Sequence, residues 1–542
     1  MAHHNSAVSS IDLHDLSFSW PDGSPVIASL TASFGRGRTG IVGRNGVGKS
    51  TLLRLIAREL APTSGTVVTH GVVGYLRQDV ALDANRSLAE VLGVAPVLEA
   101  LRRLEAGDAD PEAFDTIGES WDVEERAIAE LAELGFTGDL ETPGVLDRPV
   151  ASFSGGEVMI AGLARMRLEG ATLSLLDEPT NNLDRRAREA LFDAVRAWRG
   201  TLLVVSHDRE LLDLMDATAE LRQGEIALFG GTYSEYEEYL RGEQDAAERM
   251  LRSAEQRLRA ERRQRIEAEE KLARRAKFAR ATQERGGLPK ILVGRRKANA
   301  EASAGRHRGV QAQRVEGAEA SVEEAEARVR SDTSIRISLP ETRVPAGRTV
   351  LELDAEPRPF VLRGPERVAL LGDNGAGKTT LLSAIARGPG EAGCVVRHRI
   401  GAVGVLPQRL DILDDDASVL DNVRAAAPNA EPRELRAQLA RFLLRGDAVE
   451  RPAAGLSGGE RFRVCLARIL LADPAPQLLL LDEPTNSLDL ESVDGLVDAL
   501  AGFEGALVVV SHDERFLERL GITVRLEVRR GEPLRVAPTR VE

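Results

Sequence analysis

Four sequence motifs occur twice in this 542-residue chain, in the same order, and this repeat restricts the fold more than any other feature. A GxxxxGK[ST] loop comes first, followed by SGGE, LLDEPTN and VVSHD. The motifs begin at Gly43, Ser154, Leu175 and Val204 in the first half, and at Gly372, Ser457, Leu480 and Val509 in the second. A chain of this length holds roughly two to four domains. We therefore predict two copies of one domain.

The spacing between motifs predicts the domain boundaries. From Gln78 to Ser154 is 76 positions, but from Gln408 to Ser457 is 49, so the first copy carries 27 extra residues. We place them in a helical insertion at about 97–125, which has the pattern of helix, polar turn and helix. A segment rich in Arg, Glu and Ala separates the copies. The expected domains are 1–240, a helical linker at 241–330, and 331–542.

The two glycine-rich loops have the sequence context of phosphate-binding loops. Each follows an apolar run and precedes a helix with apolar periodicity. Glycines let backbone N–H groups turn toward phosphate oxygens, and the helix N-terminus favours negative charge. We expect the lysines to reach the β- and γ-phosphates, and Ser50 and Thr379 to hold Mg²⁺. The predicted nucleotide contacts are Gly43, Asn45, Gly46, Gly48, Lys49, Ser50 and Thr51, and Gly372, Asn374, Gly375, Gly377, Lys378, Thr379 and Thr380.

A carboxylate pair follows an apolar run in each half, which places it at the C-terminal end of a buried strand. Ligands bind at that edge of an open α/β sheet. We expect Asp177 and Asp482 to orient Mg²⁺. The adjacent Glu178 and Glu483 are expected to position or deprotonate the attacking water, which makes them the catalytic bases. The alternative for each pair is a solvated acidic turn.

A histidine and a glutamine also recur in register with these motifs. His207 and His512 each end an apolar strand and precede an aspartate. A lone histidine of this kind is usually a satisfied core residue, but the repeat favours a catalytic contact with the γ-phosphate. Gln78 and Gln408 lie 29 and 30 residues after the loop lysines. We expect both to contact the metal or its water as part of the nucleotide site.

Composition excludes several classes of protein. No run approaches the ~18–20 apolar residues of a membrane span, and the N-terminus lacks the pattern of a secretory signal. Cys394 and Cys465 have no partner spacing, so we expect small buried residues rather than a disulfide or zinc site. A cytoplasmic protein is expected. The net charge of −14, taken alone, argues against a general nucleic-acid binder.

The SGGE motif resembles the signature loop of ATP-binding cassettes, which caps the nucleotide held by the opposite cassette. With the two DEPTN motifs and the charged linker, the chain resembles the ABC-F family of soluble twin-cassette ATPases that act on ribosomes. This resemblance implies two ABC-type α/β domains joined by an antiparallel helical hairpin, two composite sites for ATP and Mg²⁺, and a monomer whose cassettes pair. The signature residues are Ser154, Gly155, Gly156 and Glu157, and Ser457, Gly458, Gly459 and Glu460.

The chain departs from the family pattern at several positions. Asn182 and Ser487 stand where histidine is common, and Phe153 replaces leucine before the first SGGE. Glu157 and Glu460 replace the commoner glutamine, and we expect both to cap their helices. Trp20 stands where cassettes often stack adenine, whereas 335–345 offers no aromatic residue. We therefore expect a weaker contact with the base in the second cassette.

The linker carries a charge opposite to that of the rest of the chain. Residues 241–330 contain 23 Lys+Arg and 15 Asp+Glu, a net charge of +8, so the rest of the chain carries −14 − 8 = −22. Within this linker, residues 271–310 contain 12 Lys+Arg and only 2 Asp+Glu. Val315, Ala318, Val322, Ala325 and Val329 form an apolar stripe, which predicts a helical hairpin with a tip at about 284–297. Solvated helix charges are the alternative to RNA contact. The predicted RNA contacts are Lys277, Arg280, Arg285, Lys290, Arg295, Arg296, Lys297, Arg306 and Arg308.

The family resemblance also implies a function. The linker of ABC-F proteins enters the tRNA exit site of the ribosome and points at the P-site tRNA and the peptidyl-transferase centre. Residues 287–308 resemble this tip in actinobacterial resistance proteins, and the apolar 291–293 are expected nearest that centre or packed within the tip. We expect an ATP-closed protein that binds rRNA and P-site tRNA and protects the ribosome against antibiotics such as macrolides and lincosamides.

Three other functions remain as alternatives. A housekeeping translation factor of the same family fits the same motifs. The energising subunit of a membrane transporter is less favoured, because such a subunit does not need a basic hairpin between fused cassettes. A DNA-repair ATPase is also less favoured, because such enzymes usually insert a coiled coil or zinc modules inside a cassette. We therefore expect no membrane domain and no DNA partner.

Overall fold

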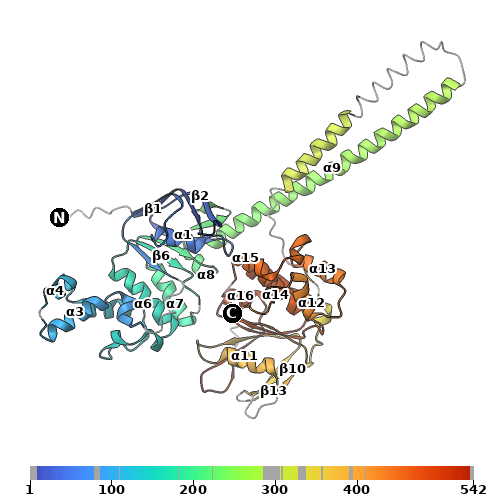
Figure 1. Cartoon of the computed structure of the whole chain (residues 1–542). Coiled ribbons are helices and arrows are strands. Elements are labelled where there is room, and N and C mark those ends of the chain that lie inside the picture. Colours follow the sequence, from blue (N-terminus) through green and yellow to red (C-terminus); the bar gives the residue numbers. More distant parts are fainter. Residues whose placement is uncertain are drawn as a thin grey trace. The chain divides into compact units, whose positions relative to one another are not determined.

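The structure is a computed structural model that describes residues 9–77, 86–108, 110–181, 183–222, 224–284, 306, 309–326, 337, 339–355, 358–389, 395–408, 410–486 and 488–537. The chain forms two compact units. One unit is Met1–Ser234 with Ser334–Glu542, and it contains both halves of the repeat. The other is Glu235–Thr333, which is the linker (Figure 1).

The first half of the repeat contains two sheets. A three-stranded antiparallel sheet has the order β2-β1-β4, and a six-stranded sheet has the order β5-β6-β7-β3-β8-β9 with only β9 antiparallel. The strands are β1 Ser10–Ser19, β2 Pro25–Phe34, β3 Gly37–Val42, β4 Ser64–His70, β5 Val73–Leu76, β6 Leu173–Asp177, β7 Thr201–Val205, β8 Ala217–Arg222 and β9 Glu225–Phe229. Strands β6 and β7 are buried along their whole length, as parallel strands covered on both faces must be.

The first half contains eight described helices. They are α1 Lys49–Ile56, α2 Leu88–Leu92, α3 Ala95–Glu105, α4 Pro111–Ile117, α5 Val123–Glu133, α6 Gly155–Leu168, α7 Arg185–Arg196 and α8 Arg209–Leu212, with 3-10 turns at Val145–Asp147 and Val150–Ser152. Helices α3 and α4 enclose a small apolar cluster of Ala100, Ala113 and Ile117. These two helices occupy the segment in which the sequence predicts an insertion.

The second half repeats this architecture. Its sheets have the orders β11-β10-β13 and β14-β15-β16-β12-β17-β18, with only β18 antiparallel in the larger one. The strands are β10 Thr349–Leu353, β11 Phe360–Arg363, β12 Arg367–Leu371, β13 Val396–Arg399, β14 Val403–Leu406, β15 Leu478–Asp482, β16 Ala506–Val510, β17 Val524–Glu527 and β18 Arg535–Ala537. The same strand order in both halves confirms the predicted duplication of one α/β domain.

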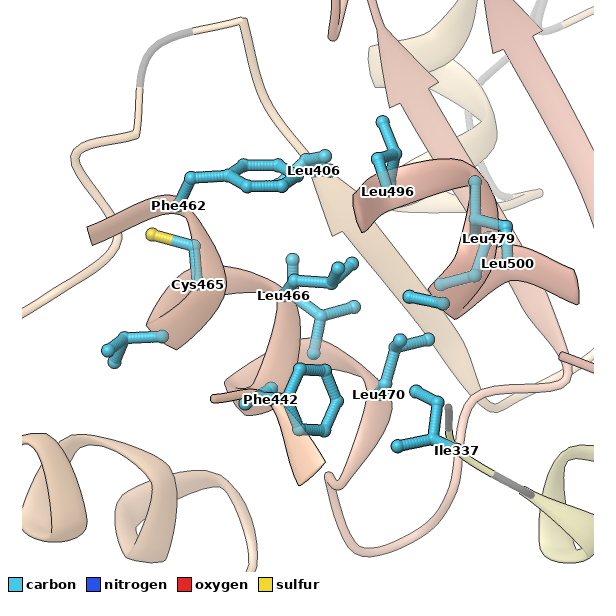
Figure 2. Packing of buried hydrophobic residues seen from close by; sticks show 14 of the residues in the cluster. Ile337, Leu406, Phe442, Phe462, Cys465, Leu466, Leu470, Leu479, Leu496 and Leu500 are labelled. Atoms are coloured by element: carbon cyan, nitrogen blue, oxygen red, sulfur yellow. The ribbon is translucent and has the colours of Figure 1, made fainter. Parts of the chain in front are cut away.

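The helices of the second half bury residues of two apolar cores, with Leu382 and Ile385 of the first helix in the smaller core and buried residues of the other helices in the larger one. These helices are α11 Lys378–Arg387, α12 Val419–Ala426, α13 Pro432–Arg441, α14 Gly458–Leu470, α15 Leu490–Ala501 and α16 Glu514–Arg519, with 3-10 turns at Pro340–Thr342, Gly446–Glu450 and Ala453–Gly455. Figure 2 shows Phe462 and Leu466 of α14 near Leu496 of α15 and Leu479 of β15. Cys465 is buried in the larger core as predicted, and burial raises the pKa of its thiol to about 12. Cys394 lies outside the described residues.

The linker unit contains one very long helix. Helix α9 spans Tyr233–Glu284, so it begins earlier than residue 241, and 309–326 form a second helical segment that returns beside it (Figure 1). The predicted stripe is buried at Val315, Ala318 and Ala325, and Arg262 pairs with Glu319 at 2.8 Å across the two helices. Within the described residues, no helix has the length and apolar character of a membrane span.

Candidate nucleotide-binding sites

Each glycine-rich loop joins a central strand to a helix, as the sequence predicts. The first connects β3 to α1, and the second connects β12 to α11. The residue before each helix is a glycine in the left-handed region, with φ of 104° at both Gly48 and Gly377. This conformation favours glycine, and it brings the loop into the first turn of the helix, where free N–H groups bind anions.

The loop lysines are buried and contact their own loops. Lys49 Nζ donates to the carbonyl oxygen of Gly43 at 2.6 Å, and Lys378 Nζ donates to that of Gly372 at 2.7 Å. Burial lowers the pKa of both lysines, against the opposing effect of nearby carboxylates. The ammonium groups are thus placed over the loops, where they can exchange carbonyl oxygens for phosphate oxygens.

The aspartates predicted to orient the metal end strands β6 and β15. Ser50 Oγ donates to Asp177 Oδ1 at 3.0 Å. In the second half, burial raises the pKa of Asp482 while a hydrogen bond from Thr379 lowers it, and Asp482 Oδ1 is buried without a hydrogen-bond partner among the described residues. An unsatisfied buried carboxylate oxygen beside a hydroxyl is a donor set that fits Mg²⁺.

The glutamates that follow these aspartates have strained backbones. Glu178 has φ of 48° and Glu483 has φ of 44°, in the left-handed region that side chains rarely adopt. Such strain costs about 1–3 kcal/mol and is typical of functional sites. Both carboxyls are buried, and burial raises the pKa of Glu178 to about 8 and that of Glu483 to about 7. These values are matched to a general base near neutral pH.

Each histidine lies against the glutamate of its own half. His207 Nε2 is 3.2 Å from Glu178 Oε1 and 3.1 Å from Asn45 Oδ1, so these acceptors assign the ring proton to Nε2. His512 Nε2 is 3.1 Å from the ammonium of Lys378, so this nitrogen accepts. Burial lowers the pKa of His207 to about 3 and that of His512 to about 4, which keeps both rings neutral.

Two cavities contain most of the predicted nucleotide contacts. The first, of about 350 Å³, is lined by Trp20, Asn45, Gly46, Gly48, Lys49, Ser50, Thr51, Glu178 and His207, among others. The second, of about 380 Å³, is lined by Asn374, Gly375, Gly377, Lys378, Thr379, Thr380, Gln408, Asp482, Glu483 and His512, together with first-half residues that include Asn181, Arg188 and Asp208. Gln78 lies outside the described residues.

The signature residues begin helices α6 and α14. Ser154 and Ser457 accept N–H bonds from Glu157 and Glu460, and these glutamates bond back to the serine N–H groups, so both expected helix caps are confirmed. No signature residue is among the described residues that line either cavity. Their pairing with the opposite nucleotide stays a prediction.

The prediction that 335–345 is the second-half counterpart of the Trp20 region is wrong, because these residues precede β10. Trp20 follows β1 and packs edge-on against Phe18, with ring centroids 5.1 Å apart. The second-half residues that match it in chain order are 354–359, the stretch of sequence between the end of β10 and the start of β11. That stretch reads DAEPRP, so it too lacks an aromatic residue. The expected difference in base contact therefore stays a prediction.

Three groups near the cavities were not predicted from the sequence. Tyr75 Oη donates to Asp177 Oδ2 at 3.2 Å, whereas Val405 is the second-half counterpart. Asp489 accepts from the backbone N–H of Asn45 at 2.8 Å across the halves. Arg188 contacts loops of both halves. The repeated aspartate at the end of each LLDEPTNxLD motif could have indicated the contact of Asp489. Nothing in the sequence indicated the contacts of Tyr75 and Arg188.

Few of the predicted RNA contacts fall on described side chains. Lys277 on α9 and Arg306 are exposed, and Arg280 lies in the described backbone of α9. Arg285, Lys290, Arg295, Arg296, Lys297 and Arg308 lie outside the described residues. Phe278 is 77% exposed on the same helix.

The raised pKa values predict how stability depends on pH. The unfolded chain releases the protons of both glutamates near pH 4.5, whereas the folded protein keeps them up to a pH of about 8 at Glu178 and about 7 at Glu483. The free energy of unfolding of the wild type therefore decreases as the pH rises through this range. Without nucleotide and with EDTA, Glu178→Gln with Glu483→Gln should gain free energy of unfolding relative to wild type between about pH 5 and about pH 8.5, on the order of a few kcal/mol. Urea unfolding at the two ends of this range measures the gain. Parallel pH profiles for the two proteins would contradict it.

Comparison with known proteins agrees with this geometry. The family model "ABC transporter" matches residues 28–181 and 359–486. The tylosin resistance ATP-binding protein TlrC of Streptomyces fradiae is 33% identical over 566 residues, covering 96% of this chain and 98% of TlrC. Human ATP-binding cassette sub-family F member 3 is 30% identical over 526 residues, covering 90% of this chain and 67% of that protein.

A solved structure shows the same fold. The archaeal ribosome recycling factor aABCE1, crystallised with the ribosomal stalk protein aP1, superimposes with a TM-score of 0.51 at 21% identity, covering 96% of this chain and 89% of that one. Two nucleotide-binding domains, two strained glutamates and these relatives lead to one conclusion: the chain belongs to the ABC-F family of twin-cassette ATPases.

Proposed function

We propose that this ATPase binds the ribosome in its ATP-closed state and acts through its linker near the peptidyl-transferase centre, as a ribosomal protection protein. The observation that carries the proposal is the charge pattern. A linker segment with 12 basic and 2 acidic residues is joined to cassettes and flanks that carry −22. Clustered basic residues bind nucleic-acid phosphates with little sequence readout.

Ion pairs along α9 support this interpretation of the charges. Near the start of the helix, arginines pair with glutamates one turn away, as Arg241 does with Glu237 at 2.7 Å and Arg252 with Glu248 at 2.8 Å. Within residues 271–310, by contrast, the sequence offers only 2 acidic residues to offset 12 basic ones. The part of the linker farthest from the cassettes in sequence is therefore the part with excess positive charge.

We propose the following roles at the two ATP sites. Lys49 and Lys378 bind the β- and γ-phosphates. The hydroxyls and carboxylates of Ser50 with Asp177, and of Thr379 with Asp482, would hold Mg²⁺ together with Gln78 and Gln408. When bound, Mg²⁺ neutralises charge that develops on the phosphate oxygens.

The remaining groups act on water and on the γ-phosphate. Glu178 and Glu483 each accept a proton from the attacking water, which their raised pKa values make favourable. The neutral ring of His207 donates from Nε2 to Glu178 and orients its carboxylate, the ring of His512 accepts from Lys378 and orients that ammonium group, and both rings contact the γ-phosphate. The SGGE loops cap nucleotide across the cassette pair, which couples ATP binding to closure.

Protection against antibiotics is the more specific part of the proposal. TlrC, the resistance protein, resembles this chain over nearly the full length of both. We expect overexpression to lower, and gene deletion to raise, susceptibility to at least one of the macrolides, lincosamides, streptogramins and pleuromutilins. Purified protein should also restore translation in vitro in the presence of that drug. Unchanged susceptibility in both strains would favour a housekeeping translation factor.

The aromatic difference between the cassettes predicts unequal affinities for ATP. We expect Trp20→Ala to weaken ATP binding at the first site by about tenfold, because stacking on a base contributes about 1–3 kcal/mol. Titration with a fluorescent ATP analogue should resolve a tighter and a weaker site in the wild type, and only weak sites in the variant. Trp121→Ala removes an exposed tryptophan outside both cavities and is the matched control. Equal reductions of affinity in the two variants would contradict the stacking role.

A further inference from the structure

Arg188 connects the loops that carry the two histidines. Its guanidinium donates to both carboxylate oxygens of Asp208, at 2.8 and 2.7 Å. Its remaining terminal nitrogen donates to the backbone carbonyl of His512 at 2.7 Å. Asp208 directly follows His207 in the sequence. One side chain from α7 of the first half therefore holds a loop of each half.

The surroundings of Arg188 make this contact specific to arginine. The residue is 8% exposed, and it lies 3.1 Å from Glu210 in addition to Asp208. Burial lowers its pKa, but Asp208, Glu210 and Asp513 outweigh that effect and keep the guanidinium charged. A planar fork with five N–H groups can bind a carboxylate with two of them and a carbonyl with a third, which an ammonium group cannot do in a fixed geometry.

The contact with His512 reaches the second ATP site. The ring of His512 lies 3.1 Å from Lys378 Nζ and 3.4 Å from Glu483 Oε1. Arg188 itself lines the cavity that contains these groups. Fixing the carbonyl of His512 therefore fixes the backbone from which the ring projects toward the lysine and the proposed base.

The repeat does not supply the converse contact. The position that matches Arg188 is Val493 on α15, a buried side chain that has no donor. Asp513, which matches Asp208, uses its carboxylate to cap α16 through the N–H of Phe516 at 2.9 Å. Of these two matching positions, only Arg188 can therefore donate a hydrogen bond from one half to the other. The acceptor is the histidine loop of the second cassette.

We propose that Arg188 is a positioning residue that makes turnover at the second ATP site depend on the first cassette. It acts by holding the His512 loop against the His207 loop, so the second site is assembled only when the first cassette is docked on it. The second cassette has Val493 at the position of Arg188, so it offers the first site no matching contact, and the first site turns over independently of Arg188. The inference rests on the proposed function, in which Glu178 and Glu483 are the catalytic bases.

Single-site enzymes test the proposal. Glu178→Gln leaves the second site active, and Glu483→Gln leaves the first. Adding Arg188→Met should lower kcat about tenfold in the Glu178→Gln background, with KM for ATP changed less than about twofold, because misplaced groups reduce the rate rather than binding. In the Glu483→Gln background, kcat should change less than about twofold, because Asp208 still accepts from the N–H groups of Glu210 and Leu211 and so keeps the His207 loop in place without Arg188. Equal reductions in both backgrounds, or no reduction in either, would overturn the proposal.

Further variants separate positioning from folding. Arg188→Met with Asp208→Asn neutralises the carboxylate that Arg188→Met leaves unpaired but does not restore the bond to His512, so second-site turnover should stay low, and full recovery would overturn the proposal. Arg188→Lys should restore part of kcat. Arg515→Met removes another ion pair between the halves, with Asp213, outside both cavities, and it should leave both single-site enzymes unchanged. Turnover above about 1% of wild type in Glu178→Gln with Glu483→Gln would instead contradict the proposed bases.

Discussion

Replacing Glu178 and Glu483 together with glutamine is expected to lower steady-state ATP hydrolysis by about 10²–10⁴-fold, the usual contribution of a general base. Glutamine keeps the size of the side chain and one acceptor oxygen, but it cannot take a proton from water. Each glutamate is buried beside a neutral histidine, follows an aspartate that fits Mg²⁺ and has a raised pKa, so it has both the position and the basicity of a general base. Phosphate release at saturating MgATP measures the reduction.

A matched double substitution controls for the general effect of removing two carboxylates. Glu59 and Glu527 form ion pairs with Arg77 and Arg529 outside both cavities. Glu59→Gln with Glu527→Gln should keep turnover within about twofold of wild type, because exposed ion pairs contribute at most about 1 kcal/mol. Comparable reductions in the two double variants would show that the cavity glutamates have no special role.

The same catalytic variant tests the link between ATP and the ribosome. If closure requires ATP and opening requires hydrolysis, the Glu178→Gln and Glu483→Gln protein should accumulate on ribosomes in ATP, while the wild type is released. Sedimentation through a sucrose cushion, with and without RNase treatment, separates ribosome binding from association with membranes or DNA. A double variant that stays free of ribosomes in ATP would contradict the proposed function while leaving the ATPase assignment intact.

The fold and most of the ATP site could be predicted because their determinants are local. A glycine-rich loop between a strand and a helix, and a carboxylate pair after a buried strand, are short patterns, and the repeat showed that they were not accidental. The helix caps at Glu157 and Glu460 depend on residues three positions apart, and they too were predictable.

What the sequence could not show depends on contacts between distant elements. Tyr75 reaches Asp177 because β5 pairs with β6 in a register that places Tyr75 beside Leu175. In the sequence Arg188 is one of four arginines on α7, and only the docking of the two halves places it on His512. The misplaced second-half segment has a simpler cause. Strand β2 has 10 residues but β11 has 4, which accounts for six residues of the shift, and no motif between residue 331 and the second phosphate loop fixes the position of the rest.

Reversing charges toward the linker tip is expected to weaken ribosome binding without changing ATP hydrolysis. Lys277→Glu, Arg280→Glu and Arg306→Glu together should raise the Kd for ribosomes by at least about tenfold, and make the dependence on salt less steep by about 0.7–0.9 for each phosphate that is no longer bound. The reason is that each basic group bound to a phosphate releases counterions. Binding at several salt concentrations, in the presence of ATP and in the catalytic double variant, measures both effects.

The start of α9 offers a control with the same change in net charge. Arg241, Arg252 and Arg259 each pair with a glutamate one turn away, at 2.7, 2.8 and 3.4 Å, so their charges are already offset within the helix. Reversing these three arginines changes the long-range attraction between the protein and rRNA by the same amount as the tip variant, because both variants replace three positive charges with three negative ones. Only the tip variant removes the proposed phosphate-binding groups. A larger reduction of affinity and a flatter salt dependence in the tip variant would therefore identify specific binding to phosphates, whereas equal reductions would mean that the linker contributes only through net charge.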